Sequence, residues 1–191
     1  PRASGIIAVE LLGDDHLVGV AITDGTRDVM LFSSAGKAVR FNEQDVRPMG
    51  RTARGVRGIK LGEGQRVIAL IIAAEGAVLT TTENGYGKRT PVSEYPLHGR
   101  GGQGVISIQT TERNGKVVGA ALVSEEDEVM LITDGGTLIR TAAKGISVLG
   151  RNTQGVRLIS LGENEKLAGI EPIAEPELSG DEDEVGENES T

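Results

Sequence analysis

The chain has 191 residues, no cysteine, a formal net charge of −8 and only four aromatic side chains. Without cysteine it has neither a disulfide framework nor a Cys-based zinc site, and its two histidines, His16 and His98, stand apart from each other. The scarcity of aromatic residues argues against the base-stacking surfaces that single-strand binders use. No long apolar run or leader pattern occurs, which predicts a cytoplasmic protein.

The negative charge is concentrated at the end of the chain. Nine of the 28 acidic residues lie in residues 171–191, where no Lys or Arg occurs, so the other 19 nearly balance the 20 basic residues. Such a charge block predicts a disordered acidic tail over residues 175–191. Two interpretations of the tail stay open: a solubilising terminus, or a DNA mimic that competes for a basic surface.

The sequence repeats itself about every fifty residues. One anchor is the glycine that closes an arginine-containing segment, at Gly5, Gly55, Gly104 and Gly155. A second anchor is an arginine that follows an apolar run, at Arg40, Arg89 and Arg140. Both anchors give the same period. This period predicts blades or arrays, in which each unit buries its apolar face against a neighbour.

The first part of the chain, up to residue 27, is expected to hold the last two strands of a unit, at residues 5–12 and 17–22. The chain starts with Pro and in the middle of a repeat, so it is expected to be a fragment of a longer protein.

Each later unit is expected to hold four strands. The first two form a hairpin around a tight turn with glycine, at residues 34–37, 83–86 and 134–137. Third strands are expected at 56–61, 105–110 and 156–161, and fourth strands at 67–72, 117–123 and 167–170. No segment has a sustained helical apolar stripe.

These patterns predict an all-β, propeller-like fold, because four-stranded units repeated around an axis are typical of propellers. The expected divisions are a half blade at residues 1–27 and blades at about 28–75, 76–124 and 125–173. About three and a half blades would leave two open ends, with exposed edges and reduced stability.

Several segments resemble the C-terminal domain of the A subunit of bacterial DNA gyrase over about residues 1–174. They include residues 29–33 with 36–41, residues 55–64, the Asn-Gly-Tyr-Gly-Lys-Arg-Thr run at 84–90, and residues 150–156. The acidic tail is similar by composition only. The resemblance implies a six-bladed β-pinwheel whose neighbouring blades exchange strands, and the chain would be its C-terminal half.

The resemblance also implies a function: wrapping of duplex DNA, without sequence specificity, around a basic rim. Residues 98–104 are similar to a degenerate form of the family's Gln-Arg-Arg-Gly-Gly-Lys-Gly box, with Gln103 where the box has Lys. The family's catalysis, with ATP and Mg²⁺, would lie elsewhere in a heterotetramer of two A and two B subunits. No catalytic residue, cofactor or metal is therefore expected in this fragment.

Two recurring sets of basic residues are the candidates for DNA contact. The first follows the hairpin turns and consists of Lys37, Arg40, Lys88, Arg89 and Arg140. A basic ring suits a bent phosphate backbone, because contacts to phosphates need no base readout. The alternative is that each arginine pairs with a local acid, such as Glu43 or Glu94.

The second set precedes the repeated glycines and consists of Arg51, Arg100 and Arg151, with Arg54 and Arg57 beside the first of them. The adjoining glycines let the backbone approach either a phosphate or a neighbouring strand. A latch between blades is thus a second interpretation of this set. Arg47, Lys60 and Lys144 are weaker candidates, more typical of a solvated face.

Other motifs point to structure. Tyr86 is expected in a hairpin and Tyr95 in packing, the glycines at 99–104 lack a phosphate-loop ending, and the acids at 125–128 lack calcium-loop spacing. Two rival functions stay open. One is the equivalent domain of topoisomerase IV, which bends DNA, and the other is a propeller-like scaffold that binds proteins alone.

Overall fold

Three antiparallel sheets make up the structure, a computed structural model that describes residues 5–173. The strands are β1 (Asp28–Ser33), β2 (Lys37–Asn42), β3 (Val67–Ile72), β4 (Ala77–Thr82), β5 (Tyr86–Pro91), β6 (Val105–Ile106), β7 (Val117–Val123), β8 (Glu128–Thr133), β9 (Leu138–Ala142), β10 (Val156–Arg157) and β11 (Leu167–Ile173). Three short 3-10 helices follow the hairpins: η1 (Glu43–Asp45), η2 (Val92–Glu94) and η3 (Ala143–Gly145).

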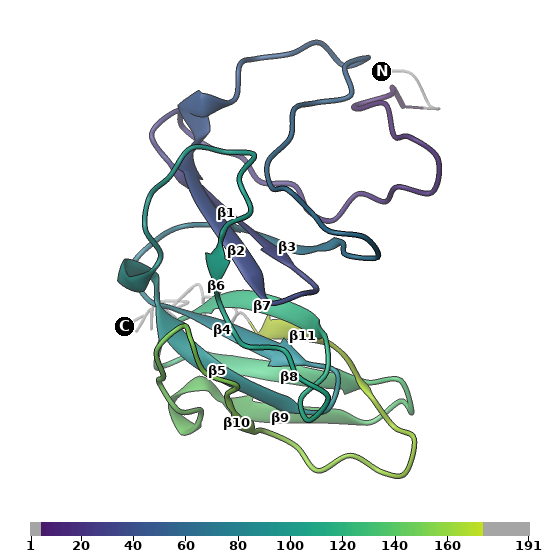
Figure 1. Ribbon diagram of the computed structural model, residues 1–191, viewed down its shortest axis with the longest axis vertical. Coiled ribbons are helices and arrows are strands. Elements are labelled where there is room, and N and C mark those ends of the chain that lie inside the picture. The colour runs from purple at the N-terminus through teal and green to yellow at the C-terminus, as the bar shows by residue number, and fades with distance from the viewer. Residues whose placement is uncertain (1–4, 174–191) are drawn as a thin grey trace, which may run out of the picture.

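The first sheet lies above the other two in Figure 1, where the second and third sheets overlap. Their strand orders are β3-β1-β2-β6, β10-β5-β4-β7 and β11-β8-β9. The three hairpins have the same register, because the recurring arginine faces the third residue of the first strand in each: Met30 with Arg40, Leu79 with Arg89, and Met130 with Arg140. The repeat read from the sequence is thus a structural repeat, and the fold is an all-β pinwheel of propeller-like blades.

Neighbouring blades exchange a strand. β6 comes after the second hairpin in the sequence, yet it pairs with β2 of the first sheet, with Val105 opposite Ala38. In the same way β10 comes after the third hairpin and pairs with β5 of the second sheet. Each exchanged strand ties one blade to the next by main-chain hydrogen bonds.

The glycine in front of each exchanged strand makes this pairing possible. Gly104 and Gly155 have φ values of +73° and +76°, a conformation that other residues adopt only at a cost. A side chain would also collide with the neighbouring strand, since a β-carbon on Gly155 would lie 2.7 Å from the carbonyl oxygen of Gly87. The repeated glycines therefore allow two strands to approach each other closely.

Apolar side chains fill the space between the sheets. Between the first and second sheets, Met30, Phe32 and Ile71 pack with Val78 and Tyr95. The Phe32 and Tyr95 rings meet edge to face, with centroids 5.9 Å apart. The Tyr95 hydroxyl lies 2.8 Å from the Ser107 hydroxyl, so its polar end is satisfied. Tyr95 is thus a packing residue, as its sequence context predicts.

A second apolar cluster joins the second and third sheets. It is built from Leu79, Val123, Val129, Ala143 and Ile146, all buried. Valine, isoleucine and leucine thus fill the space that aromatic side chains fill in other cores.

The opening residues differ from the sequence prediction. Residues 5–27 form no strand in the structure, although strands are expected at 5–12 and 17–22. They find no strand to pair with in the described part of the chain, and an unpaired strand leaves its main-chain groups to water. Their apolar side chains are consequently exposed, with Ile22 100% and Val20 77% accessible.

The expected third strands are also shorter than predicted. Only Val105–Ile106 and Val156–Arg157 are strands, and residues 56–61 are not. A third strand pairs with the preceding blade and not with its own, so its length depends on a neighbour that sequence periodicity does not reveal. The expected fourth strands are present as β3, β7 and β11. The expected acidic tail, residues 175–191, lies outside the described residues.

Replacing Gly155 by alanine should destabilise the fold more than the same change at Gly64. Both glycines have a positive φ, but a β-carbon at Gly64 meets no atom within 4 Å. We expect Gly64→Ala to cost about 1 kcal/mol and Gly155→Ala at least about 3 kcal/mol in urea unfolding. Equal losses would contradict the close approach of the exchanged strand.

Candidate nucleic-acid interface

Two arginines of the first set, Arg40 and Arg89, link their hairpins to the next blade. Arg40 lies on β2, where its guanidinium contacts Asp28 at 2.8 Å and donates to the carbonyls of Val92 and Tyr95 at 3.3 and 3.2 Å. Those carbonyls flank η2 in the second unit. Arg40 is half-buried, and its charge is already matched by an acid.

Arg89 makes the equivalent link one unit later. Its side chain donates to the carbonyls of Ile146 and Lys144, at 2.8 and 3.4 Å, on either side of the end of η3. Glu125 lies 3.6 Å from its other terminal nitrogen. Only 5% of Arg89 is exposed, so it is part of the interior between two blades and not of a surface ring.

Arg140 occupies the third equivalent position and lies on the surface. Its side chain is 56% exposed and pairs with Glu128 at the start of β8. Each of the three arginines thus meets an acid, as the alternative interpretation has it, but the acids are Asp28, Glu125 and Glu128 and not Glu43 or Glu94. For Arg40 and Arg140 the acid stands at the start of the same hairpin, facing its end, which is a pattern that sequence reasoning missed. Glu125 instead reaches Arg89 from the loop between β7 and β8.

Lys88 is the most buried basic residue in residues 5–173. Its side chain has no exposed surface, and its ammonium group donates to the carbonyls of Gly150 and Arg151 in the next blade's connection. Removal from water lowers the pKa of Lys88 from 10.5 to about 8. Lys37, which starts β2 of the first unit, is half-buried beside Lys60 and Gln103.

The second set of arginines also spans neighbouring blades. Each of three arginines in this set donates to a carbonyl of the preceding unit, two residues after that unit's repeated glycine. The pairs are Arg51 with Ile7, Arg100 with Arg57, and Arg151 with Ile106. The distances are 3.5, 3.1 and 3.1 Å. These contacts join neighbouring blades, as in the latch interpretation. Arg51 and Arg100 are nevertheless exposed, whereas Arg151 is half-buried.

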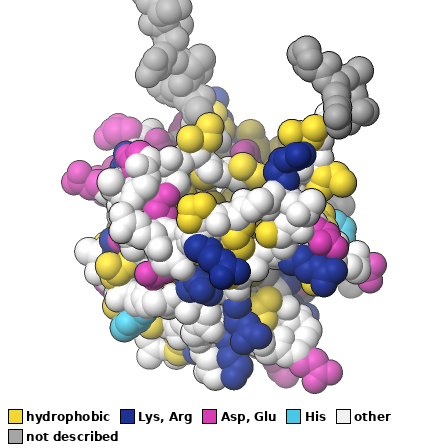
Figure 2. Space-filling model, turned by 90° about the horizontal axis from the view of Figure 1, so that it is seen from above, with side chains coloured by type: hydrophobic (Ala, Val, Ile, Leu, Met, Phe, Trp, Pro, Cys, Tyr) yellow, Lys and Arg dark blue, Asp and Glu magenta, His cyan; other side chains and the backbone are white. Residues whose placement is uncertain are grey.

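Five exposed arginines gather where the connection after η1 meets the segment before β6. Arg100 joins the two segments, because it donates to the carbonyls of Asp45 and Arg57 at 2.8 and 3.1 Å. We call this set the arginine group: Arg47, Arg51, Arg54, Arg57 and Arg100. The face seen from the top of Figure 1 carries a band of Lys and Arg side chains beside hydrophobic ones (Figure 2).

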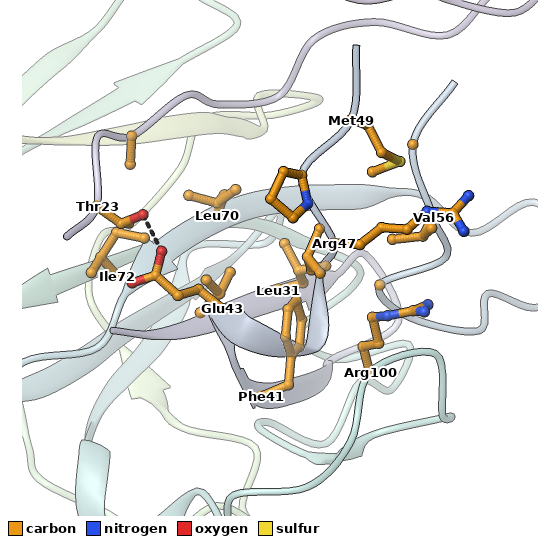
Figure 3. A pocket seen from close by; sticks show the side chains of 16 residues that line it. Thr23, Leu31, Phe41, Glu43, Arg47, Met49, Val56, Leu70, Ile72 and Arg100 are labelled. Atoms are coloured by element: carbon orange, nitrogen blue, oxygen red, sulfur yellow. Dashed lines mark hydrogen bonds between the residues drawn. The ribbon is translucent and has the colours of Figure 1, made fainter. Parts of the chain in front are cut away.

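A pocket of about 580 Å³ lies beside the arginine group. Leu31 and Phe41 of the first hairpin line its apolar part, while Arg47 and Arg100 lie on one side of it (Figure 3). On the opposite side the Thr23 hydroxyl donates to the Glu43 carboxylate. The pocket is thus apolar at its floor and basic along one edge.

A second basic cluster surrounds the turn between β4 and β5, and the sequence prediction did not include it. Its members are Arg113, Lys116, Arg157 and Lys166. Lys116 and Lys166 do recur, together with Arg66, directly before the fourth strand of each unit, whereas Arg113 and Arg157 do not recur in every unit. The prediction considered only the basic residues after the hairpin turns and before the repeated glycines, so it missed all four. The signal that was available is the pair Arg113 and Lys116 on either side of the Asn114-Gly115 turn.

No metal cluster occurs in the described part of the chain. Groups of three or more His, Cys, Asp or Glu side chains that could hold an ion are absent from residues 5–173. The acidic run at 125–128 is a charged turn, in which the Asp127 carboxylate accepts from the Ser124 amide at 2.7 Å. Within the same residues no helix is long and apolar enough to cross a membrane.

The chain matches the model of a known protein family. Residues 1–24, 27–74, 77–124 and 127–174 match the model of the DNA gyrase C-terminal domain, described as a β-propeller. The chain belongs to this family. The DNA gyrase A protein of Salmonella typhimurium is 59% identical over 177 residues, which are 92% of this chain and 20% of that relative. The chain thus spans about one fifth of the length of this gyrase relative.

Solved structures agree with the family and the fold. A DNA gyrase A C-terminal domain has a TM-score of 0.82 and 31% sequence identity to this chain, covering 90% of it and 59% of that domain. The C-terminal domain of a DNA topoisomerase IV also has a TM-score of 0.82, at 23% identity, covering 87% of this chain and 52% of that one. The topoisomerase IV likeness is one of fold alone.

The buried ammonium group of Lys88 should make the stability of this gyrase domain rise with pH. The unfolded chain holds this proton up to about pH 10.5, whereas the folded chain releases it near 8, so unfolding takes up a proton between these values. We expect wild type to gain about 3 kcal/mol over Lys88→Met across this window.

Urea unfolding of both proteins at intervals from pH 7 to 11 measures this effect. The neutral amine still donates to both carbonyls, so the gain is not offset by a lost hydrogen bond. Because Tyr86 and Tyr95 ionise in both proteins, their effects cancel in the difference. Parallel pH curves for the two proteins would show that the Lys88 amine is not desolvated.

Proposed function

We propose that this chain binds and wraps duplex DNA without sequence specificity, as part of DNA gyrase. The observation that carries the proposal is the arginine group, five exposed guanidinium groups on two touching connections of a gyrase C-terminal domain. Arginine and lysine contacts to phosphates release counterions and suffice for wrapping, because a bent duplex can be held without base contacts.

The proposed DNA contacts are those predicted residues whose side chains reach the surface: Arg51, Arg54, Arg57, Arg100 and Arg140, with half-buried Lys37 at their margin. Lys88 and Arg89 instead hold neighbouring blades together, since burial removes both from the reach of a phosphate. Arg40 and Arg151, half-buried and bonded to carbonyls of adjacent blades, belong mainly to the same structural group.

In the whole enzyme this domain would act beside catalytic parts that lie outside this chain. We propose a bacterial cytoplasmic heterotetramer of two A and two B subunits, in which ATP and Mg²⁺ are used elsewhere and negative supercoils are introduced. The acidic tail, residues 175–191, would compete with DNA for the arginine group. This follows from charge alone, because the tail has no basic residue.

Gyrase is favoured over topoisomerase IV by sequence similarity. The identity to a gyrase A protein is 59%, compared with 23% to the topoisomerase IV domain of equal TM-score. A scaffold that binds only proteins is not favoured by any particular contact in residues 5–173.

A salt titration of duplex binding tests the proposal. We expect the full chain to bind two duplexes of equal length and unrelated sequence with equal affinity, and to weaken steeply as salt rises. Replacing Arg51, Arg54 and Arg57 together by glutamine should reduce the slope of log Kd against log salt by about 2 to 3. Fluorescence anisotropy measures both quantities.

Arg27→Gln serves as the control, because this exposed arginine pairs with Asp24 and lies outside the arginine group. Absent binding of either duplex at low salt would overturn the proposal, and so would a slope that the triple substitution leaves unchanged.

A further inference from the structure

Two guanidinium groups converge on one phenol at the start of β5. The Cζ atoms of Arg113 and Arg157 lie 4.8 and 5.6 Å from the centroid of the Tyr86 ring. Arg157 also donates to the phenolic oxygen at 3.1 Å. These arginines come from different elements, the turn before β7 and the exchanged strand β10. The strand exchange therefore assembles the cluster from two units of the repeat.

Neither guanidinium group of the cluster forms an ion pair within the described part of the chain. Five arginines form ion pairs in residues 5–173, and neither Arg113 nor Arg157 is among them. Glu165 lines the same pocket, but its carboxylate accepts from the Thr133 hydroxyl at 2.5 Å and from the Gly162 amide at 2.8 Å. Two like charges held close together without a directly paired acid favour the arrival of an anion.

Over the two adjoining hollows at this turn, four basic side chains face three acidic ones. The pocket holds about 300 Å³ and is lined by Asn84, Tyr86, Arg113 and Arg157 among others. Lys166 donates to the Asn84 side chain, and Lys116 lies beside the same asparagine. Besides Glu165, the acids there are Glu83 and Glu112, and the Glu83 carboxylate already accepts from the Lys116 amide at 3.0 Å.

We propose that Arg113 and Arg157, both exposed and held against the Tyr86 ring, form a binding site for one backbone phosphate of duplex DNA. The inference rests on the proposed function and gives it a specific contact point outside the arginine group. Each guanidinium offers paired donors in a plane, which match two oxygens of a phosphate. Tyr86 is only 6% exposed, so it supports the two guanidinium groups and leaves the contact with the phosphate to them.

The Tyr86 ring holds both guanidinium groups in place before a ligand binds. Stacking against Tyr86 fixes the direction of both guanidinium groups, so less side-chain freedom is lost on binding. The two groups act on the phenol as well: the hydrogen bond from Arg157, followed by that from Arg113, lowers the pKa of Tyr86. A phosphate between them would weaken this effect.

The site belongs to one blade only. The residues that align with Tyr86 in the neighbouring units are Lys37 and Thr137. Counted back from the start of the fourth strand, those that align with Arg113 are Glu63 and Glu163. A contact that does not repeat would hold the duplex at one fixed place along its path around the blades.

Duplex binding by the full chain, measured by anisotropy as salt is raised, tests this site. Replacing Arg113 and Arg157 together by glutamine should weaken binding about tenfold and reduce the salt slope by about 0.9, the value for one phosphate. The matched control is Arg27→Gln with Lys144→Gln, which removes the same charge from exposed positions elsewhere. Thermal unfolding of each variant checks that it is folded.

A second readout reports on the site itself. The chain has two tyrosines, so carbon-13 labelling of their Cζ atoms gives two NMR signals, and buried Tyr95 serves as the reference. Adding duplex should raise the pH at which Tyr86 ionises and leave Tyr95 unchanged. Millimolar inorganic phosphate should have a much smaller effect, because the proposed ligand is a phosphate of the duplex.

The outcomes separate the two proposals. If wild type does not bind duplex, this site and the proposed function both fail. If wild type binds but the double variant has the slope of the control, only the site fails, and Arg113 and Arg157 merely pack against Tyr86. An equal response of Tyr86 to inorganic phosphate would also overturn the site as a duplex contact.

Discussion

Exchange of one strand between neighbouring blades is the constraint on which the rest of the structure depends. β6 completes the sheet of the first hairpin, and β10 completes that of the second. Each sheet with four strands therefore needs residues from two units of the repeat. A blade of this kind cannot form before its neighbour's chain is present, so stability spreads from blade to blade.

Three kinds of contact meet at each boundary between blades. The exchanged strand supplies main-chain hydrogen bonds, apolar side chains fill the space between sheets, and an arginine from the hairpin reaches the carbonyls around the next 3-10 helix. The arginine suits this place because its planar group donates in several directions at once. A lysine at the preceding position does the same for the carbonyls of Gly150 and Arg151.

This use of basic residues inside the fold changes how the sequence is interpreted. A recurring arginine indicates a recurring environment, and in a pinwheel that environment is either a blade boundary or the outer rim. Burial decides between them: Arg89 is 5% exposed, whereas the side chain of Arg140, at the same position of the repeat, is 56% exposed. The same residue type at the same position thus stabilises one blade and faces solvent in another.

Much of the fold could be predicted from the sequence. The fifty-residue period, the glycine turns and the alternating apolar residues place the three hairpins and the fourth strands correctly. Strand exchange came from the family resemblance, because periodicity within a unit carries no information on which sheet a strand joins. The strands expected in residues 5–27 are absent for the same reason: sequence periodicity does not show whether a partner strand is there to pair with.

The candidate site could be predicted only in part. Periodicity finds arginines that recur, and so it found both the latches and the exposed arginine group without separating them. It could not find Arg113 and Arg157, which meet only because β10 lies against β5. Residues that act together but do not repeat require the three-dimensional structure.

The most direct test of this account compares Arg89→Gln with Arg57→Gln in two measurements, urea unfolding and duplex affinity at fixed salt. Arg89 is buried among carbonyls, so its loss should cost about 3 kcal/mol of stability and leave the affinity of the folded protein unchanged. Arg57 is exposed, so its loss should leave stability unchanged and weaken duplex binding several-fold. The reverse pattern, or equal effects of both substitutions on duplex affinity, would contradict the division of the basic residues between blade boundaries and DNA.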